Sequence, residues 1–181
     1  MISGTIPTGT GPFTYEWQKT YDLAVAPSLI AGADTKDYTF TATEADTLWI
    51  RRIVTDNGAV PLVITDTSKW VNIIVQPAIT GNLVGKDTTI CYNQDPLSLI
   101  PLNAGPLEGN GIYQYQWIQS LSSDMSDSSP ATGTSDQAAY DPPALTDTTY
   151  YKRTVISGRC IDQSATVAIT VLPSILSLIH I

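Results

Sequence analysis

The residues of this chain that could contact a ligand are mainly aromatic, and they recur in one phrase. Residues 13–17 read FTYEW and residues 113–117 read YQYQW, with the two tryptophans 100 positions apart. On a β-strand, alternate residues share a face, so the aromatic side chains would form a row. Such a row is either a strip on which sugar rings stack or the buried wall of a sheet. The residues concerned are Tyr15, Trp17, Tyr115 and Trp117.

Comparison of the two phrases favours the buried wall. Phe13 stands where the second phrase has Tyr113, which keeps the bulk but loses the hydroxyl that a sugar could use. We therefore predict that Trp17 and Trp117 are buried, like the tryptophan of the third strand in immunoglobulin-type sandwiches. Aromatic residues without a counterpart in the other phrase remain candidates for ligand contact. They are Tyr21, Trp70 and Tyr140.

Residues for covalent, metal or phosphate chemistry are scarce. The single histidine is His180, beside the end of the chain, so no Ser–His or Cys–His pair can be built within the repeated phrases. Two distant cysteines do not supply the four ligands of a zinc site. No phosphate loop or dinucleotide fingerprint is present. We expect no enzymatic activity, no metal and no cofactor.

A loop rich in serine and aspartate, residues 120–136, could offer oxygen ligands to calcium. Its spacing does not match an EF-hand, and aspartate is also common in turns because it accepts local backbone hydrogen bonds. We favour a solvated loop and keep calcium binding as the alternative. The carboxylates in and after this loop are Asp124, Asp127, Asp136 and Asp141.

The two cysteines, Cys91 and Cys160, both lie in the second half of the chain. A disulfide between them would close a loop of about 70 residues and stabilise the fold by roughly 4 kcal/mol on the chain-entropy model. It would also indicate an oxidising, extracytoplasmic environment. The alternative is two free thiols in the core.

The elements that carry these residues are themselves repeated. Three blocks recur in the same order at nearly constant spacing, and a period of about 100 residues fits a whole small domain. We predict a domain over 1–78 that lacks its first strand or strands, a complete domain over 79–175, and a non-native tail over 176–181. The matching blocks are 11–18 with 111–118, 46–52 with 147–153, and 73–79 with 169–175.

The second copy shows about seven short strands and no helical period, which predicts an all-β fold of two tandem immunoglobulin-like sandwiches. Asp46 and Asp147 each lie in a polar turn that precedes a strand. On the strand after Asp147, Tyr150 or Tyr151 is expected to be an inward-facing corner tyrosine. Arg52 and Arg153 are expected to lie along the sheet beside a carboxylate. The predicted strands are 88–92, 97–102, 112–119, 137–140, 148–157 and 165–172.

Composition limits the classes of partner. Hydrophobic residues make up 43% and charged residues 14%, which is enough apolar material for a core. The net charge is −8 and no basic patch extends beyond the pairs Arg51-Arg52 and Lys152-Arg153, so we expect no nucleic-acid partner. No apolar run is long enough to span a bilayer, so direct membrane insertion is not expected.

Several motifs of the second copy together resemble the Ig-like and PKD-like tandem repeats of large Bacteroidetes surface proteins. Those proteins are adhesin-like, are linked to gliding motility and are often exported by type IX secretion. The motifs are TICYNQDP at 89–96, YQYQW at 113–117, YDPPALTDTTYYKR at 140–153, and Cys160.

This resemblance implies an extracellular or cell-surface β-sandwich that acts as a spacer or contributes to adhesion. Its expected partners are neighbouring repeats of the same chain, with surface glycans or proteins as further candidates. The resemblance assigns no catalytic residue. The alternative function is a carbohydrate-binding or accessory module of a secreted glycan-active enzyme.

Overall fold

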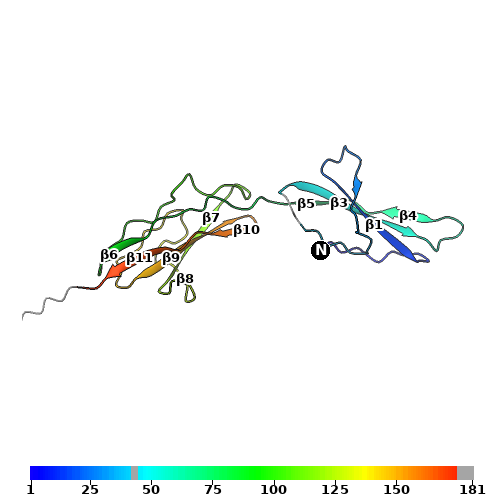
Figure 1. The fold of residues 1–181 in the computed structure, drawn as a ribbon. Coiled ribbons are helices and arrows are strands. Elements are labelled where there is room, and N and C mark those ends of the chain that lie inside the picture. The colour runs from blue at the N-terminus through cyan, green and yellow to red at the C-terminus, as the bar shows by residue number, and fades with distance from the viewer. Residues whose placement is uncertain (42–44, 175–181) are drawn as a thin grey trace, which may run out of the picture. The chain divides into compact units, whose positions relative to one another are not determined.

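The computed structural model describes residues 1–41 and 45–174, and every regular element within them is a β-strand. The chain divides into two compact units, Met1–Val75 (unit 1) and Gln76–Ile181 (unit 2). Each unit contains its own sheet (Figure 1). The predicted all-β class is therefore confirmed. The predicted boundary at 78 lies three residues beyond Val75, and the predicted tail, 176–181, lies outside the described residues.

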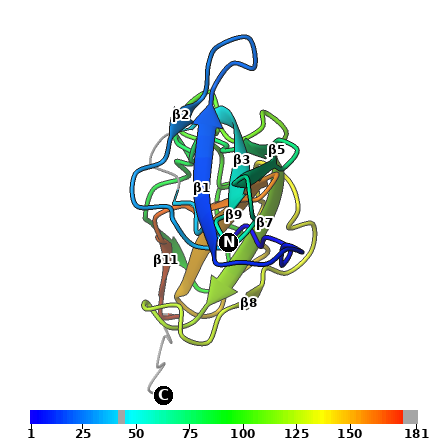
Figure 2. The same cartoon turned by 90° about the vertical axis from the view of Figure 1, so that its right-hand side faces the viewer.

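The sheet of unit 1 has five strands in the order β2-β1-β3-β4, with β5 also paired to β3. The long strand β3 makes this possible, because its second half pairs with β4 and its first half with β5. β1 and β3 lie side by side and antiparallel (Figure 2). The bounds are β1 Phe13–Thr20, β2 Ser28–Leu29, β3 Thr47–Asp56, β4 Ile64–Thr67 and β5 Val71–Ile74.

The sheet of unit 2 repeats this plan with six strands in the order β6-β11-β9-β7-β8, and β10 also pairs with β9. β6 runs parallel to β11, whereas the other pairs in this sheet are antiparallel. The bounds are β6 Thr88–Cys91, β7 Gln114–Ser120, β8 Ser129–Pro130, β9 Thr149–Ser157, β10 Cys160–Gln163 and β11 Val167–Leu172.

Two of the predicted strands, 97–102 and 137–140, are not regular strands. They meet in an isolated antiparallel bridge between Leu99 and Tyr140. The short strands β8 and β10 were not predicted.

In each unit a serine separates two short strands that pair with the same long strand. Ser68 lies between β4 and β5, and Ser164 lies between β10 and β11. Each serine donates its backbone N–H to an arginine carbonyl, Arg52 or Arg153, at 2.9 Å. Each serine Oγ accepts the N–H of that same arginine, at 2.9 Å in unit 1 and 3.0 Å in unit 2. The serine Oγ thus takes the place of a backbone carbonyl in the strand pairing. One long strand can therefore pair with two short strands, one on each side of the serine.

A tryptophan lies at the centre of the core in each unit. Trp17 is 3% exposed and Trp117 is 0% exposed, which confirms the predicted burial. Their indole Nε1 groups donate to the carbonyls of Thr35 and Gln137, both at 2.9 Å. The buried core residues are Trp17, Ala33, Leu48 and Ile50 in unit 1, and Val84, Leu99, Trp117, Ala131, Tyr140, Tyr151, Val167 and Ile169 in unit 2.

Candidate functional site

The three aromatic residues predicted to face a ligand do not form a common surface. Tyr140 is 1% exposed and stacks on Trp117 with ring centroids 5.6 Å apart, so its predicted ligand-facing role is wrong. Its counterpart is Tyr38, whose ring lies 5.6 Å from Trp17. The sequence comparison missed this pair because the chain segments between Trp and Tyr differ in length.

Tyr21 and Trp70 both lie in unit 1, and each has a cation over its ring. Tyr21 is 55% exposed, with the Lys19 ammonium 5.7 Å from its centroid. Trp70 is half-buried, and the Arg51 guanidinium covers it at 4.4 Å. The two rings therefore do not present a bare stacking platform of the kind that sugars use.

The predicted disulfide is wrong, because Cys91 and Cys160 are both free cysteines. Cys91 ends β6 beside Leu172, beyond the Thr149 end of β9. Cys160 pairs with Ser157 at the other end of β9. The eight residue steps of β9 span roughly 26 Å, whereas a disulfide requires Cα atoms within about 7 Å.

The two recurring arginines are buried, but the expected carboxylate partner is absent from the described residues. Only one ion pair occurs there, between Lys36 and Asp37. Arg52 donates to the carbonyls of Lys36 and Thr5, at 2.9 and 3.0 Å. Neutral carbonyl oxygens therefore replace the expected carboxylate in unit 1.

Arg153 of unit 2 is fully buried, and its guanidinium also has two hydrogen-bond acceptors. It donates to Asn82 Oδ1 at 2.9 Å and to the Ala138 carbonyl at 2.6 Å, while its Nη2 has no partner among the described residues. Its guanidinium lies 5.3 Å from the ring of Tyr115, as that of Arg52 lies 5.4 Å from Tyr15. The half-buried tyrosines of the two aromatic phrases thus cover the arginines.

In the polar turns that contain Asp46 and Asp147, the main-chain carbonyl of the aspartate accepts a hydrogen bond. The carbonyl of Asp46 accepts Val75 N–H at 2.8 Å, and that of Asp147 accepts the Thr149 hydroxyl at 2.9 Å. Of the two candidate corner tyrosines, Tyr151 is fully buried, whereas Tyr150 is half-buried. Tyr151 does not make the hydrogen bond of a corner tyrosine, because its hydroxyl has no partner among the described residues.

The aspartates of the 120–136 loop bind donors of the loop itself. Asp124 accepts Ser126 N–H at 3.0 Å, and Asp127 accepts the Ser120 hydroxyl. Hydrogen bonds from the side chain and the backbone N–H of Ser126 lower the pKa of the Asp124 carboxyl group below its ordinary value, and the Ser120 hydroxyl does the same for Asp127. Within residues 1–41 and 45–174, no group of three or more His, Cys, Asp or Glu side chains could hold a metal ion.

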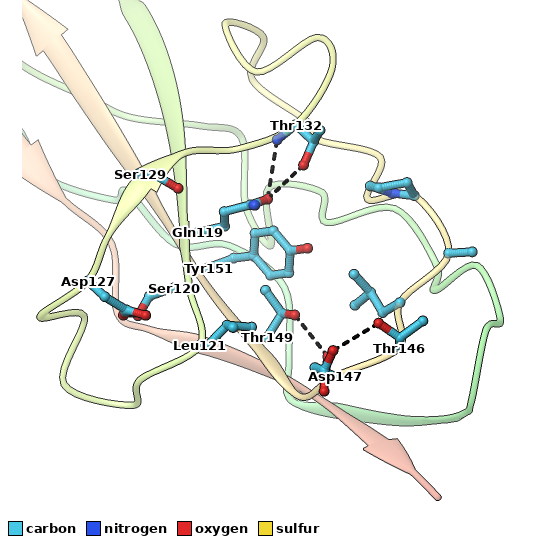
Figure 3. Close-up of a pocket in the computed structure, with 13 residues that line it drawn as sticks. Gln119, Ser120, Leu121, Asp127, Ser129, Thr132, Thr146, Asp147, Thr149 and Tyr151 are labelled. Carbon is cyan, nitrogen blue, oxygen red and sulfur yellow. Dashed lines mark hydrogen bonds between the residues drawn. The ribbon is translucent and has the colours of Figure 1, made fainter. Parts of the chain in front are cut away.

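The side chain of Tyr151 instead points into a hollow of about 400 Å³ in unit 2 (Figure 3). The hollow lies where the end of β7, the start of β9 and the two loops 127–132 and 143–147 meet. Asp127 and Asp147 are its only charged lining residues, so it is acidic. The residues that line it are Gln119, Ser120, Leu121, Asp127, Ser129, Thr132, Pro143, Ala144, Leu145, Thr146, Asp147, Thr149 and Tyr151.

Sequence reasoning missed this hollow, although it singled out three of its lining residues, Asp127, Asp147 and Tyr151. Gln119 lies on a predicted strand, and its Oε1 accepts the N–H and hydroxyl of Thr132 at 3.2 and 3.1 Å. The useful signal was the position of Tyr151, which matches Ile50 in the repeated block. Ile50 fills this core position in unit 1 without a hydroxyl. The hydroxyl of Tyr151 is therefore not required by the core of unit 2.

Comparison with known proteins gives a match to one family model. The model of a family described as Domain of unknown function (DUF8696) matches residues 80–173, which is slightly more than half of the chain. No curated protein matches the chain.

Proposed function

The chain belongs to the family described as a domain of unknown function (DUF8696), and from that premise we propose a structural role for it. Each unit is an immunoglobulin-like sandwich, and the pair is a non-catalytic spacer module of a large secreted or cell-surface protein. The single observation that carries this proposal is the repeated core. In both units a buried tryptophan, a tyrosine packed against it and a carbonyl-bound arginine recur around separate sheets.

A spacer must also transmit position from one unit to the next. Val75 N–H donates to Asp46 in unit 1, while the side chain of the next residue, Gln76, accepts Arg159 N–H in unit 2. The carbonyl of Pro77 accepts Gly109 N–H. Each unit therefore holds its own end of the junction, and the fixed φ of Pro77 restricts the connection further. These features support a connection with little free chain.

An adhesive contribution is the second candidate, and the β3–β4 loop of unit 1 favours it. This loop has seven residues, 57–63, where unit 2 has only Gly158 and Arg159. Its tip exposes Val60 at 91% and Leu62 at 74%. An exposed apolar cluster of this kind is typical of protein interaction surfaces. Because residues 59–63 have no polar side chain, the partner that fits is an apolar protein surface rather than a glycan.

Single-molecule pulling of the whole chain tests the spacer proposal. We expect two separate unfolding events of unequal contour length, because the cores are separate and the units differ in size. A single event that involves the whole chain would contradict two independent modules. Staining of intact source cells with an antibody against the chain tests the location, and staining only after lysis would contradict the surface assignment.

A further inference from the structure

We propose that the hollow at Tyr151 in unit 2 binds a small, uncharged, hydroxyl-rich molecule, such as a single sugar ring. This inference is independent of the spacer role, because a spacer requires no ligand. It also differs from the aromatic platform expected from the sequence, since it rests on hydroxyl, amide and carboxylate groups.

The first observation is the unpaired hydroxyl of Tyr151. This side chain is 0% exposed, and its oxygen has no hydrogen-bond partner among the described residues. Burial of an unpaired hydroxyl is unfavourable, so native proteins rarely retain one without a reason. Burial also raises the pKa of this phenol far above its ordinary value, which keeps it a neutral group that both donates and accepts.

The second observation comes from the equivalent position in unit 1. In the strand pairing, Trp17 lies opposite Arg52 and Trp117 lies opposite Arg153, which places Ile50 where unit 2 has Tyr151. Ile50 is also 0% exposed. Unit 1 therefore packs a wholly apolar side chain at this position, which indicates that the hydroxyl of Tyr151 is not needed for packing in unit 2.

The third observation is the set of free polar groups that line the same hollow. Gln119 uses only its Oε1, so its Nε2 amide is a free donor among the residues described. Asp147 accepts the Thr146 hydroxyl through Oδ2 and leaves Oδ1 without a hydrogen bond in the same set. The hydroxyl of Ser129 also lines the hollow. In Figure 3 the ring of Tyr151 lies between the side chains of Gln119 and Asp147.

The charge and shape of the hollow select the class of ligand. Its lining contains two carboxylates and no Lys, Arg or His, which disfavours anions. Leu121, Pro143, Ala144 and Leu145 provide an apolar wall, on which the C–H face of a sugar ring can pack. The volume of about 400 Å³ lies within the range of small-molecule pockets, roughly 300 to 1,000 Å³.

The hollow at the same place in unit 1 provides an internal comparison. It measures about 220 Å³ and is lined by Lys19, Tyr21, Asp46 and Leu48, at the positions of Gln119, Leu121, Asp147 and Thr149. Leu48 and Ile50 remove the two hydroxyls that Thr149 and Tyr151 supply in unit 2. We therefore assign binding to unit 2 alone.

The test is an NMR titration of the whole 181-residue chain with glucose, galactose, mannose and N-acetylglucosamine, alongside glucuronate and protonated glucosamine. We expect at least one uncharged sugar to shift the amide signals of Gln119, Ser129, Thr149 and Tyr151, with no shifts in unit 1. Glucuronate should not bind. The variant Tyr151→Phe should weaken the binding about tenfold, as the loss of one hydrogen bond implies.

The matched control is Tyr150→Phe, which removes a hydroxyl from the adjacent residue outside the hollow and should leave the affinity unchanged. Tyr151→Phe should keep the unfolding midpoint in urea or raise it, because it removes an unpaired polar group. A second variant, Gln119→Leu, should also weaken binding. The proposal is overturned if no uncharged sugar shifts these signals, if only glucosamine does, or if Tyr151→Phe binds like the wild type.

Discussion

Arg153 and Asn82 form a buried pair in which a charged group is bound by a neutral one. The guanidinium Nε donates to Asn82 Oδ1 at 2.9 Å, across 71 residues of sequence. Asn82 in turn donates its amide to the Arg153 carbonyl at 3.3 Å and to the Asp162 carbonyl at 3.4 Å. Burial lowers the pKa of the Arg153 guanidinium below its ordinary value. A single asparagine thus joins the first loop of unit 2 to the middle of its sheet.

Replacement of this asparagine should therefore destabilise unit 2. We expect Asn82→Ala to lower the free energy of unfolding by about 2–3 kcal/mol, because a buried charged donor loses its acceptor. Chemical denaturation with urea measures the change. The control is Asn103→Ala, which removes two hydrogen bonds of an exposed side chain, to the Gly81 carbonyl and from Gly105 N–H, and should cost less than about 1 kcal/mol. Equal losses in the two variants would show that Asn82 does not support Arg153.

The carboxyl group of Asp127 should make unit 2 sensitive to acid. The hydroxyl of Ser120, opposed in part by desolvation, lowers the pKa of Asp127 below its ordinary value of 3.8. A lowered folded-state pKa stabilises the protein above the unfolded-state value, and this stabilisation is lost as pH falls through the folded-state value. We expect Asp127→Asn to be less stable at pH 7 and to flatten the stability curve below about pH 4.

Urea unfolding at several pH values checks this prediction. Asp95→Asn is the control, because no hydrogen bond to its carboxylate occurs among the described residues. This substitution should leave the shape of the curve unchanged. If Asp127→Asn and the wild type lose stability in parallel as pH falls, the hydrogen bonds to Asp127 do not contribute.

The apolar loop of unit 1 should control adhesion without affecting the fold. We expect combined Val60→Ser, Leu62→Ser and Val63→Ser substitutions to reduce retention on a phenyl resin strongly. Each change should alter stability by no more than about 0.5 kcal/mol, since these side chains are exposed. The control replaces three exposed residues of unit 2, Leu97, Ile112 and Ile161, by serine. Similar loss of retention in both variants would show that the loop has no special role.

Reduction should not change the stability of the chain. Cys91 is exposed and Cys160 is half-buried, and the length of β9 separates them. We expect the unfolding midpoint of the monomer to be the same with and without dithiothreitol. Both thiols should be alkylated in the unfolded protein without prior reduction, as mass spectrometry can measure. A midpoint that falls on reduction would contradict the free thiols.

Local alternation of side chains allowed much of the fold to be predicted. The phrases at 13–17 and 113–117 predicted strands β1 and β7 and the burial of Trp17 and Trp117, because neighbouring residues on a strand face opposite sides. The same rule predicted β9 and β11. Repetition of the phrases also predicted two units, since each contains its own copy of the core.

Residues brought together by loops could not be predicted in this way. Tyr140 was expected to be exposed because it has no partner at constant spacing, yet the loop before it places its ring on Trp117. The cysteines seemed a suitable pair, yet strand register places them at opposite ends of β9.

The sequence by itself determined the strands, the repeat and the buried tryptophans, because these depend on short-range periodicity. Only the tertiary structure decided which partners the buried polar groups have. Asn82 reaches Arg153 across 71 residues, and the hollow at Tyr151 forms where two strands and two loops meet. Such contacts depend on loop paths and on strand register, which local side-chain patterns do not specify.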